Sequence, residues 1–315
     1  MARTAPFGSW SSPITSERIV SESSPIRELA VDTAGALYWT EQRPGDGGKT
    51  TLVRHAPDGT RTDVVVSPFD VRSRVHEYGG GAFAVSQGTV VFSNDGDRRL
   101  YRVDPGKSPV AITPAQGDAR WADLVVDRLR NRVFAVREVH DGSDVTNEIV
   151  SVALDGEGSP RTAVTGADFY AAPRLSPDGR QLAFLSWEQP DMPWDSTDLY
   201  VADLHVDGSL GPAKAVAGGP RESVQQPQWS PRGNLYFVSD RTGWWNLYIW
   251  RNGRVDPVSP AQAEMGGPPW VFGMSTYAFE NEERIVCAVN RDGLWALEQI
   301  DTLKKVWSQY DFFFL

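Results

Sequence analysis

The chain has 315 residues, with 31 basic and 41 acidic side chains and a formal net charge of -10. An acidic protein repels phosphate backbones, so this charge argues against nucleic acid as a partner. Hydrophobic residues make up 40% of the chain, enough for a substantial core. The single cysteine, Cys287, excludes an intramolecular disulfide, and its apolar neighbours predict a buried, unreactive thiol.

The N-terminus lacks the apolar stretch of a signal peptide, and no run of apolar residues is long enough to cross a membrane. We therefore expect a soluble, cytoplasmic protein without a membrane partner. The first predicted element is a helical turn around Ile14 to Val20, and we expect no other helix.

The rest of the chain repeats one unit, in which short strands rich in Val, Phe, Tyr and Trp alternate with polar turns. The copies are centred, in chain order, on Gly35, Gly88, Asn131, Gly179, Gly233 and Glu283. They follow one another at steps of 53, 43, 48, 54 and 50 residues. A period of about 40–55 residues with about four strands per unit is typical of a β-propeller. We predict an all-β propeller with six recognisable blades, and a linear β-array is the alternative.

Two copies of the unit contain the clearest turns, Ser176-Pro-Asp-Gly179 and Ser230-Pro-Arg-Gly233. Proline sets the backbone angle of the second turn position, and glycine accepts a positive φ near the end of the turn. These segments therefore predict tight connections between consecutive strands of a blade.

The C-terminal end does not match the repeat. We assign residues 1–303 to the propeller domain and residues 304–315 to an atypical tail, which has five aromatic residues in its last ten positions. The tail is either a strand of the last blade or sequence unrelated to the repeat, and we favour the second. Six units followed by such a tail predict a gap or an imperfect last blade, and hence self-association.

Four segments have a more specific pattern than the repeat itself: Gly8-Ser-Trp-Ser-Ser-Pro-Ile-Thr15, Arg72-Ser-Arg-Val-His-Glu-Tyr-Gly-Gly-Gly81, Met192-Pro-Trp-Asp195 and residues 226–248. They resemble the N-terminal β-propeller of the prolyl-oligopeptidase (S9) family of serine peptidases. The acylaminoacyl-peptidase-like and dipeptidyl-aminopeptidase-like members are the most similar. The resemblance extends from about residue 7 to residue 297.

This resemblance implies a propeller, usually of seven or eight blades, that precedes an α/β-hydrolase domain with a Ser, Asp and His triad. The sequence departs from that pattern, because it has six repeats and no Gly-x-Ser-x-Gly motif. We therefore interpret the chain as a non-catalytic propeller that gates substrate access, truncated before the hydrolase domain. Its expected partners are a peptide or that hydrolase domain. The alternative is a free-standing TolB-like or WD-like propeller that acts as a protein-interaction scaffold.

The most distinctive candidate site is the run Arg74, His76, Glu77 and Tyr78, which is followed by three glycines. Glycines permit close approach of another backbone, and the charged residues could face a partner domain or the channel. The alternative is structural: the glycines pack near the propeller axis and the charges form internal pairs. Without a nucleophile, His76 is not expected to act as a general base.

Two further loops contain candidate residues. Arg241, Trp244 and Trp245 belong to a polar hairpin, where the tryptophans either pack between blades or grip a substrate. Trp194 and Asp195 end a proline-rich loop that is expected to be rigid, and in the resembling peptidases such loops face the catalytic domain.

No metal or cofactor is expected. The segment Asn94-Asp-Gly-Asp97 lacks the distal ligand of a calcium loop and predicts a hairpin turn instead. The histidines are scattered over different repeats without zinc-binding spacing: His55, His76, His140 and His205.

Overall fold

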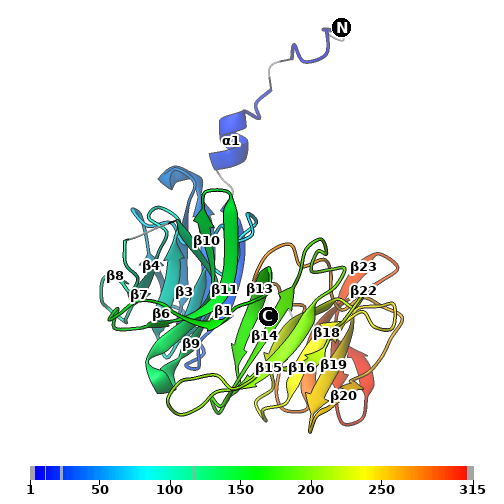
Figure 1. The fold of residues 1–315 in the computed structure, drawn as a ribbon. Coiled ribbons are helices and arrows are strands. Elements are labelled where there is room, and N and C mark those ends of the chain that lie inside the picture. The colour runs from blue at the N-terminus through cyan, green and yellow to red at the C-terminus, as the bar shows by residue number, and fades with distance from the viewer. Residues whose placement is uncertain (1–3, 11, 22–23, 116–117, 311–315) are drawn as a thin grey trace.

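The computed structural model describes residues 4–10, 12–21, 24–115 and 118–310 of the chain. A short helix, α1 (Ser16–Ser21), precedes the first strand and coincides with the predicted helical turn (Figure 1). Two 3-10 turns, η1 (Pro44–Asp46) and η2 (Arg128–Arg130), interrupt the strands. No helix in the described part of the chain has both the length and the apolar character that crossing a bilayer requires.

The strands form six antiparallel sheets of four, each with its strands in chain order. Blade 1 contains β1 (Ile26–Val31), β2 (Leu37–Arg43), β3 (Lys49–His55) and β4 (Arg61–Val65). Blade 2 contains β5 (Phe83–Ser86), β6 (Thr89–Asn94), β7 (Arg99–Val103) and β8 (Val110–Ala111). Blade 3 contains β9 (Ala119–Asp127), β10 (Arg132–Asp141), β11 (Asp144–Ala153) and β12 (Arg161–Val164).

The second half of the chain repeats this arrangement, which confirms the predicted propeller of six four-stranded blades. Blade 4 contains β13 (Phe169–Leu175), β14 (Gln181–Trp187), β15 (Asp198–Asp203) and β16 (Lys214–Ala217). Blade 5 contains β17 (Val224–Trp229), β18 (Leu235–Ser239), β19 (Asn246–Arg251) and β20 (Arg254–Pro257). Blade 6 contains β21 (Tyr277–Phe279), β22 (Arg284–Arg291), β23 (Leu294–Asp301) and β24 (Val306–Gln309).

The predicted turns join the first and second strands of their blades. Gly179 and Gly233 have φ values of 66° and 78°, and each donates its N–H to the carbonyl oxygen of the turn's first serine at 2.8 Å. In the left-handed region a glycine avoids the steric cost that a side chain would add. Local turn chemistry therefore fixes where the inner strands of blades 4 and 5 reverse.

Part of the atypical tail belongs to the last blade. The strand β24 pairs with β23, with Trp307 opposite Ile300, and Trp307 packs against the core between blades 5 and 6. Residues 306–309 therefore form an outer strand of the last blade, which was the first of our two alternatives. For these residues, the interpretation that we favoured, sequence unrelated to the repeat, is wrong. Residues 311–315 lie outside the described residues.

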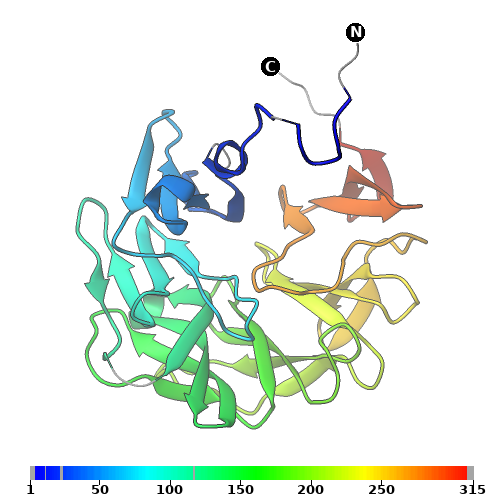
Figure 2. The ribbon, with the colours of Figure 1, turned by 90° about the horizontal axis from the view of Figure 1, so that it is seen from above.

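The core consists of five clusters of buried apolar side chains, and each cluster joins two successive blades. Within the described residues no such cluster joins blade 6 back to blade 1. Figure 2 shows the same feature, a ring that is open between the blue strands of blade 1 and the red strands of blade 6. Apolar side chains are exposed on both of these blades, including Leu29 (62%) and Leu294 (77%). The predicted gap is thus present.

Bulges in the inner strands tie neighbouring blades together. Asp123 and Gln226 both have a left-handed backbone where the register of their strands shifts. The Asp123 carboxylate accepts a hydrogen bond from the Ala172 N–H at 2.7 Å, and the Gln226 amide oxygen accepts one from the Thr276 N–H at 2.7 Å. These bonds join the inner strand of blade 3 to that of blade 4, and the inner strand of blade 5 to the connection that enters blade 6.

Candidate functional site

All nine candidate side chains lie in connections at one end of the propeller. In an up-and-down blade, the connection between the second and third strands and the connection to the next blade emerge at the same end. Residues 74–78 connect β4 to β5, residues 194–195 connect β14 to β15, and residues 241–245 connect β18 to β19. We call this end the loop face.

The three glycines after Tyr78 bring two distant loops of this chain into contact. The Gly79 carbonyl oxygen accepts a hydrogen bond from the Phe272 N–H at 2.9 Å, and Gly80 forms a parallel β-bridge with Phe272. A Cβ atom on Gly80 would lie 2.5 Å from the Phe272 carbonyl oxygen. The connection from blade 1 to blade 2 thus meets the connection from blade 5 to blade 6 over the middle of the ring (Figure 2).

His76 is enclosed by aromatic rings. Its ring centroid lies 5.1 Å from Phe169, 5.4 Å from Trp187 and 4.9 Å from Phe272. Burial lowers the pKa of His76 to about 4, although the carboxylate of Glu138 acts in the opposite direction. The imidazole is therefore neutral at physiological pH, and a hydrogen bond with the Asn147 side chain opposes the effect of burial on its pKa.

Glu77 belongs to an ion-pair network that also contains Arg120, Glu138 and His140. Arg120 Nη1 donates to Glu77 at 2.6 Å and to Glu138 at 3.1 Å, and His140 Nε2 lies 2.7 Å from Glu138. The hydrogen bond from Arg120 lowers the pKa of Glu77. Glu138 also accepts the His76 backbone N–H at 2.8 Å, so the network holds the loop in place.

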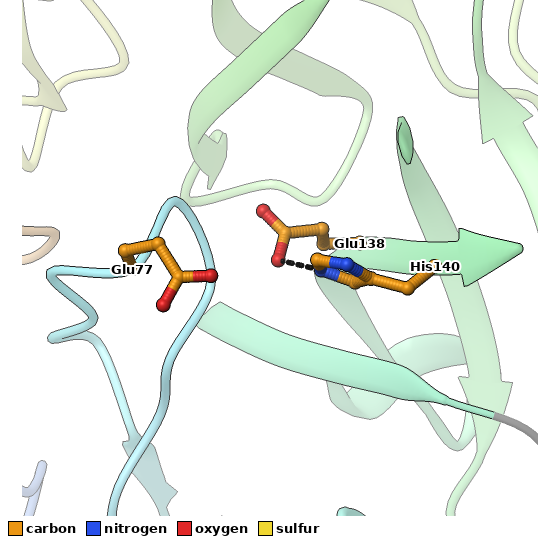
Figure 3. Close-up of side chains that lie close together, drawn as sticks. All are labelled: Glu77, Glu138 and His140. Atoms are coloured by element: carbon orange, nitrogen blue, oxygen red, sulfur yellow. Dashed lines mark hydrogen bonds and ion pairs between the residues drawn. The ribbon is translucent and has the colours of Figure 1, made fainter. Parts of the chain in front are cut away.

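The same cluster has the composition of a cation site. Ligand atoms of Glu77, Glu138 and His140 lie within 4.8 Å of one another (Figure 3). The guanidinium of Arg120, however, already bonds both carboxylates and offsets one of their two negative charges. We therefore interpret the cluster as an ion-pair network and not as a metal centre.

The remaining charged candidates form internal pairs. Arg74 Nε lies 3.0 Å from Asp95, and Arg241 Nη2 lies 2.7 Å from Glu222. The Asp195 carboxylate accepts the Met192 N–H at 3.1 Å and thereby closes its own loop. Each of these side chains is thus held by a contact within this chain.

The two tryptophans of the β18–β19 hairpin differ in environment. The Trp245 side chain packs against the core between blades 5 and 6, and the backbone N–H of Trp245 donates to the Glu264 carboxylate at 2.8 Å. Trp244 is 40% exposed. The hairpin therefore combines interblade packing with one exposed aromatic ring on the loop face.

Aromatic side chains from three loops meet at the rim of a cavity in the loop face. Trp270 lies 5.4 Å from Tyr78 and 4.4 Å from Trp194, measured between ring centroids. Beneath this rim is a cavity of about 410 Å³, which His76 and Glu77 also line. Sequence reasoning missed Trp270, although the segment Gly266-Gly-Pro-Pro-Trp270 has the same proline-aromatic pattern as the loop that contains Trp194.

Two solved structures resemble this chain over almost its whole length. Puromycin hydrolase matches 98% of this chain with a TM-score of 0.90 and 33% sequence identity. A puromycin-hydrolyzing peptidase from Mycobacterium tuberculosis matches 98% with a TM-score of 0.87 and 33% identity. The resemblance to the S9 peptidase propeller is confirmed. The S9-type propeller seen here spans only 50% of the length of each of these two proteins.

A more distant solved structure shows a similarity of fold only. A putative TolB from Agrobacterium tumefaciens matches 79% of the chain with a TM-score of 0.53 and 16% identity, which shows a shared propeller architecture. No family model and no curated protein match the chain.

Proposed function

We propose that this chain is the substrate-gating propeller of an S9-type serine peptidase and that its loop face meets an α/β-hydrolase domain. The observation that carries the proposal is the match of nearly the whole chain, at 33% identity, to one half of puromycin hydrolase. The aromatic rim supports the loop face as the meeting surface, because Tyr78 and Trp270 are 61% and 50% exposed. Exposed clusters of large apolar side chains are typical of interfaces.

The architecture of a propeller supports a gating role, because its blades surround a central axis. On the loop face, the connections that contain Gly80 and Phe272 bridge one another. A catalytic domain seated on the loop face would therefore be reached by short, extended chains more readily than by folded proteins. Acylaminoacyl-peptidase and dipeptidyl-peptidase specificities are two forms that such an activity would take.

A chimeric enzyme tests this proposal. This chain replaces the matching half of puromycin hydrolase, and hydrolysis of puromycin and of peptides of increasing length is measured. We expect activity on short substrates and none on a folded protein. The control places the putative TolB propeller, which shares the fold at 16% identity, in the same position and should be inactive.

Equal activity of the two chimeras, or cleavage of folded protein, contradicts the proposal. If only the native enzyme is active while this chain is folded, the free-standing interaction scaffold becomes the better interpretation.

A further inference from the structure

Another cavity lies between blades 5 and 6, at the end of the propeller opposite the loop face. This end carries the connections between the first and second strands and between the third and fourth strands of each blade. Residues in or beside the β17–β18, β19–β20, β21–β22 and β23–β24 turns line the cavity. Its volume of about 300 Å³ is at the lower end of the range of ligand pockets, roughly 300–1,000 Å³, and is sufficient for a small ligand.

The lining of this cavity is positively charged, although the whole chain has a net charge of -10. It contains two carboxylates and four basic side chains: Asp256, Glu282, Arg232, Arg251, Arg254 and Lys305. At neutral pH the carboxylates offset two of the basic groups, which leaves two positive charges. A hollow surface lined by one sign of charge concentrates ions of the opposite sign.

The ion pairs of the lining do not use all of this positive charge. Asp256 is shared by two guanidinium groups, with Arg254 Nε at 2.8 Å and Arg251 Nε at 3.9 Å. Glu282 pairs with Arg232 at 3.1 Å. Within the part of the chain that the structure describes, the Lys305 ammonium group has neither an ion pair nor a hydrogen bond. Lys305 and the more loosely paired Arg251 are therefore available to an added anion.

A buried hydroxyl group also lines the cavity. Tyr236 is 5% exposed, and its hydroxyl forms no hydrogen bond with any described residue. The fully enclosed atoms without a partner in the described ranges do not include this oxygen, so it is accessible from the cavity. Burial raises the pKa of Tyr236, although the charge of Arg251 acts in the opposite direction, so the hydroxyl remains a donor at neutral pH. Such a donor needs an acceptor from solvent or from a ligand.

A phosphate group matches these donors. The oxygens of a phosphate dianion accept hydrogen bonds, and a guanidinium group binds two of them at once. Two negative charges also match the two positive charges that the carboxylates leave uncompensated. Pro257 and Leu303 are exposed on the same lining and suit an apolar substituent on the phosphate.

We propose that this cavity binds a phosphate group, free or as the monoester of a small molecule, through Arg251, Lys305 and the Tyr236 hydroxyl. The bound group would link the two blades, because Arg251 and Tyr236 belong to blade 5 and Lys305 belongs to blade 6. The site is at the end opposite the loop face, so the proposal goes beyond the proposed function and does not depend on it.

Titration of the full chain with three anions tests the proposal. The probes are inorganic phosphate, phenyl phosphate and benzoate, added at pH 8 and constant ionic strength and followed by NMR. Both phosphates are dianions at this pH, whereas benzoate has the ring of phenyl phosphate but a single charge. We expect each phosphate to bind at least about fivefold more tightly than benzoate, with chemical-shift changes concentrated in residues 251–258 and 302–305. Tighter binding of phenyl phosphate than of inorganic phosphate would identify a monoester as the ligand, and equal binding would identify free phosphate.

Matched variants locate the site. Arg251→Met should weaken phosphate binding about fivefold, whereas Arg284→Met should leave it unchanged. The two side chains are 55% and 50% exposed and each pairs with one carboxylate, but Arg284 does not line the cavity. Tyr236→Phe removes only the hydroxyl and should weaken binding about threefold. Asp256→Asn releases Arg251 and should strengthen binding about threefold.

The proposal is overturned if neither phosphate binds, if benzoate binds as tightly as phenyl phosphate, or if the chemical-shift changes lie outside the cavity. Equal effects of Arg251→Met and Arg284→Met would also overturn it, because they would show a general effect of net charge. Both arginines are on the surface, so their comparison remains decisive if Tyr236→Phe or Asp256→Asn does not fold. Since the chimeric enzyme does not enter these measurements, failure of the proposed function and failure of this proposal are distinguishable.

Discussion

His76 and Glu28 are partly buried titratable side chains whose pKa values shift in opposite directions, and both shifts favour the neutral form. Burial lowers the pKa of His76 to about 4. Burial raises the pKa of Glu28 to about 7, with the charge of Asp123 adding to the shift and the hydrogen bond from the Ala82 N–H opposing it. Each residue therefore links folding to pH, with opposite sign.

The sign of each linkage gives a testable prediction. As pH falls from 6.5 to 4, unfolded His76 binds a proton that folded His76 does not, so its contribution to stability is lost. As pH rises from 4.5 to 7, unfolded Glu28 releases its proton first, so its contribution is lost in that direction. Relative to the unmodified chain, Glu28→Gln should make the free energy of unfolding rise more steeply with pH between pH 5 and 6.5. His76→Asn should make it rise less steeply over the same range, and each substitution should change the slope by up to about 1.4 kcal/mol per pH unit.

Urea denaturation at several pH values measures these slopes. Glutamine keeps the acceptor for the Ala82 N–H, and asparagine tolerates the positive φ of 54° at position 76. The slope is informative even where a substitution lowers stability at every pH. Parallel pH profiles of the two variants would show that neither residue has a shifted pKa.

The ion-pair network at Glu138 gives a second prediction at the residue scale. The side chain of Glu138 is 4% exposed, whereas the side chain of Glu77 is 70% exposed. Arg120→Met leaves the Glu138 carboxylate buried without the guanidinium and should lower the free energy of unfolding by about 3 kcal/mol. Glu77→Gln removes only an exposed pair and should cost less than about 1 kcal/mol. Similar costs of the two substitutions in urea denaturation would argue against a buried network.

At the scale of elements, the contact between the β4–β5 and β20–β21 connections depends on glycine. Gly80 has a φ of 91°, and a Cβ there would collide with backbone atoms of Phe272. Gly243 has a similar φ of 83°, but a Cβ there would meet nothing within 4 Å. Alanine substitutions at the two positions therefore separate the cost of a positive φ from the cost of a clash with the Phe272 backbone.

We expect Gly243→Ala to cost about 1 kcal/mol, which is the price of a side chain at positive φ. Gly80→Ala should cost at least about 2 kcal/mol more, because the two loops must move apart. Thermal or urea denaturation of both variants measures the difference. If Gly80→Ala costs no more than Gly243→Ala, the Gly80–Phe272 contact does not hold the loops together.

For the whole molecule, the open side of the ring is the dominant feature. A closed propeller covers both faces of every blade, but here, among the residues that the structure describes, blades 1 and 6 share no buried cluster and carry exposed apolar side chains. We expect the isolated chain to self-associate through these faces. The double variant Val31→Glu with Leu294→Glu should shift the chain toward monomer.

Val206→Glu serves as the control, since Val206 is 96% exposed in the turn between β15 and β16 of blade 4. Size-exclusion chromatography with light scattering over a range of concentrations measures the oligomeric state. A monodisperse monomer of the unmodified chain would contradict this expectation, as would an equal effect of the control.

The features that the sequence alone predicted are local ones. Six copies of a strand and turn pattern were visible because alternating side chains and turns such as Ser176-Pro-Asp-Gly179 act over a few neighbouring residues. The number of blades and the gap followed from counting these copies. His76, Glu77, Tyr78 and Trp194 were identified from motif resemblance, and all four line the cavity.

Only the tertiary structure decided which of the candidates act together. Trp270 meets Tyr78 and Trp194 although these residues are far apart in the sequence, because connections of different blades emerge on the same face. The same holds for Arg120, which pairs with Glu77 across the boundary between blades 2 and 3. Such contacts depend on how the blades pack side by side. No local sequence pattern encodes the distance between loops of different blades. The sequence therefore determined the blades and the loops, and the packing of the blades determined the site.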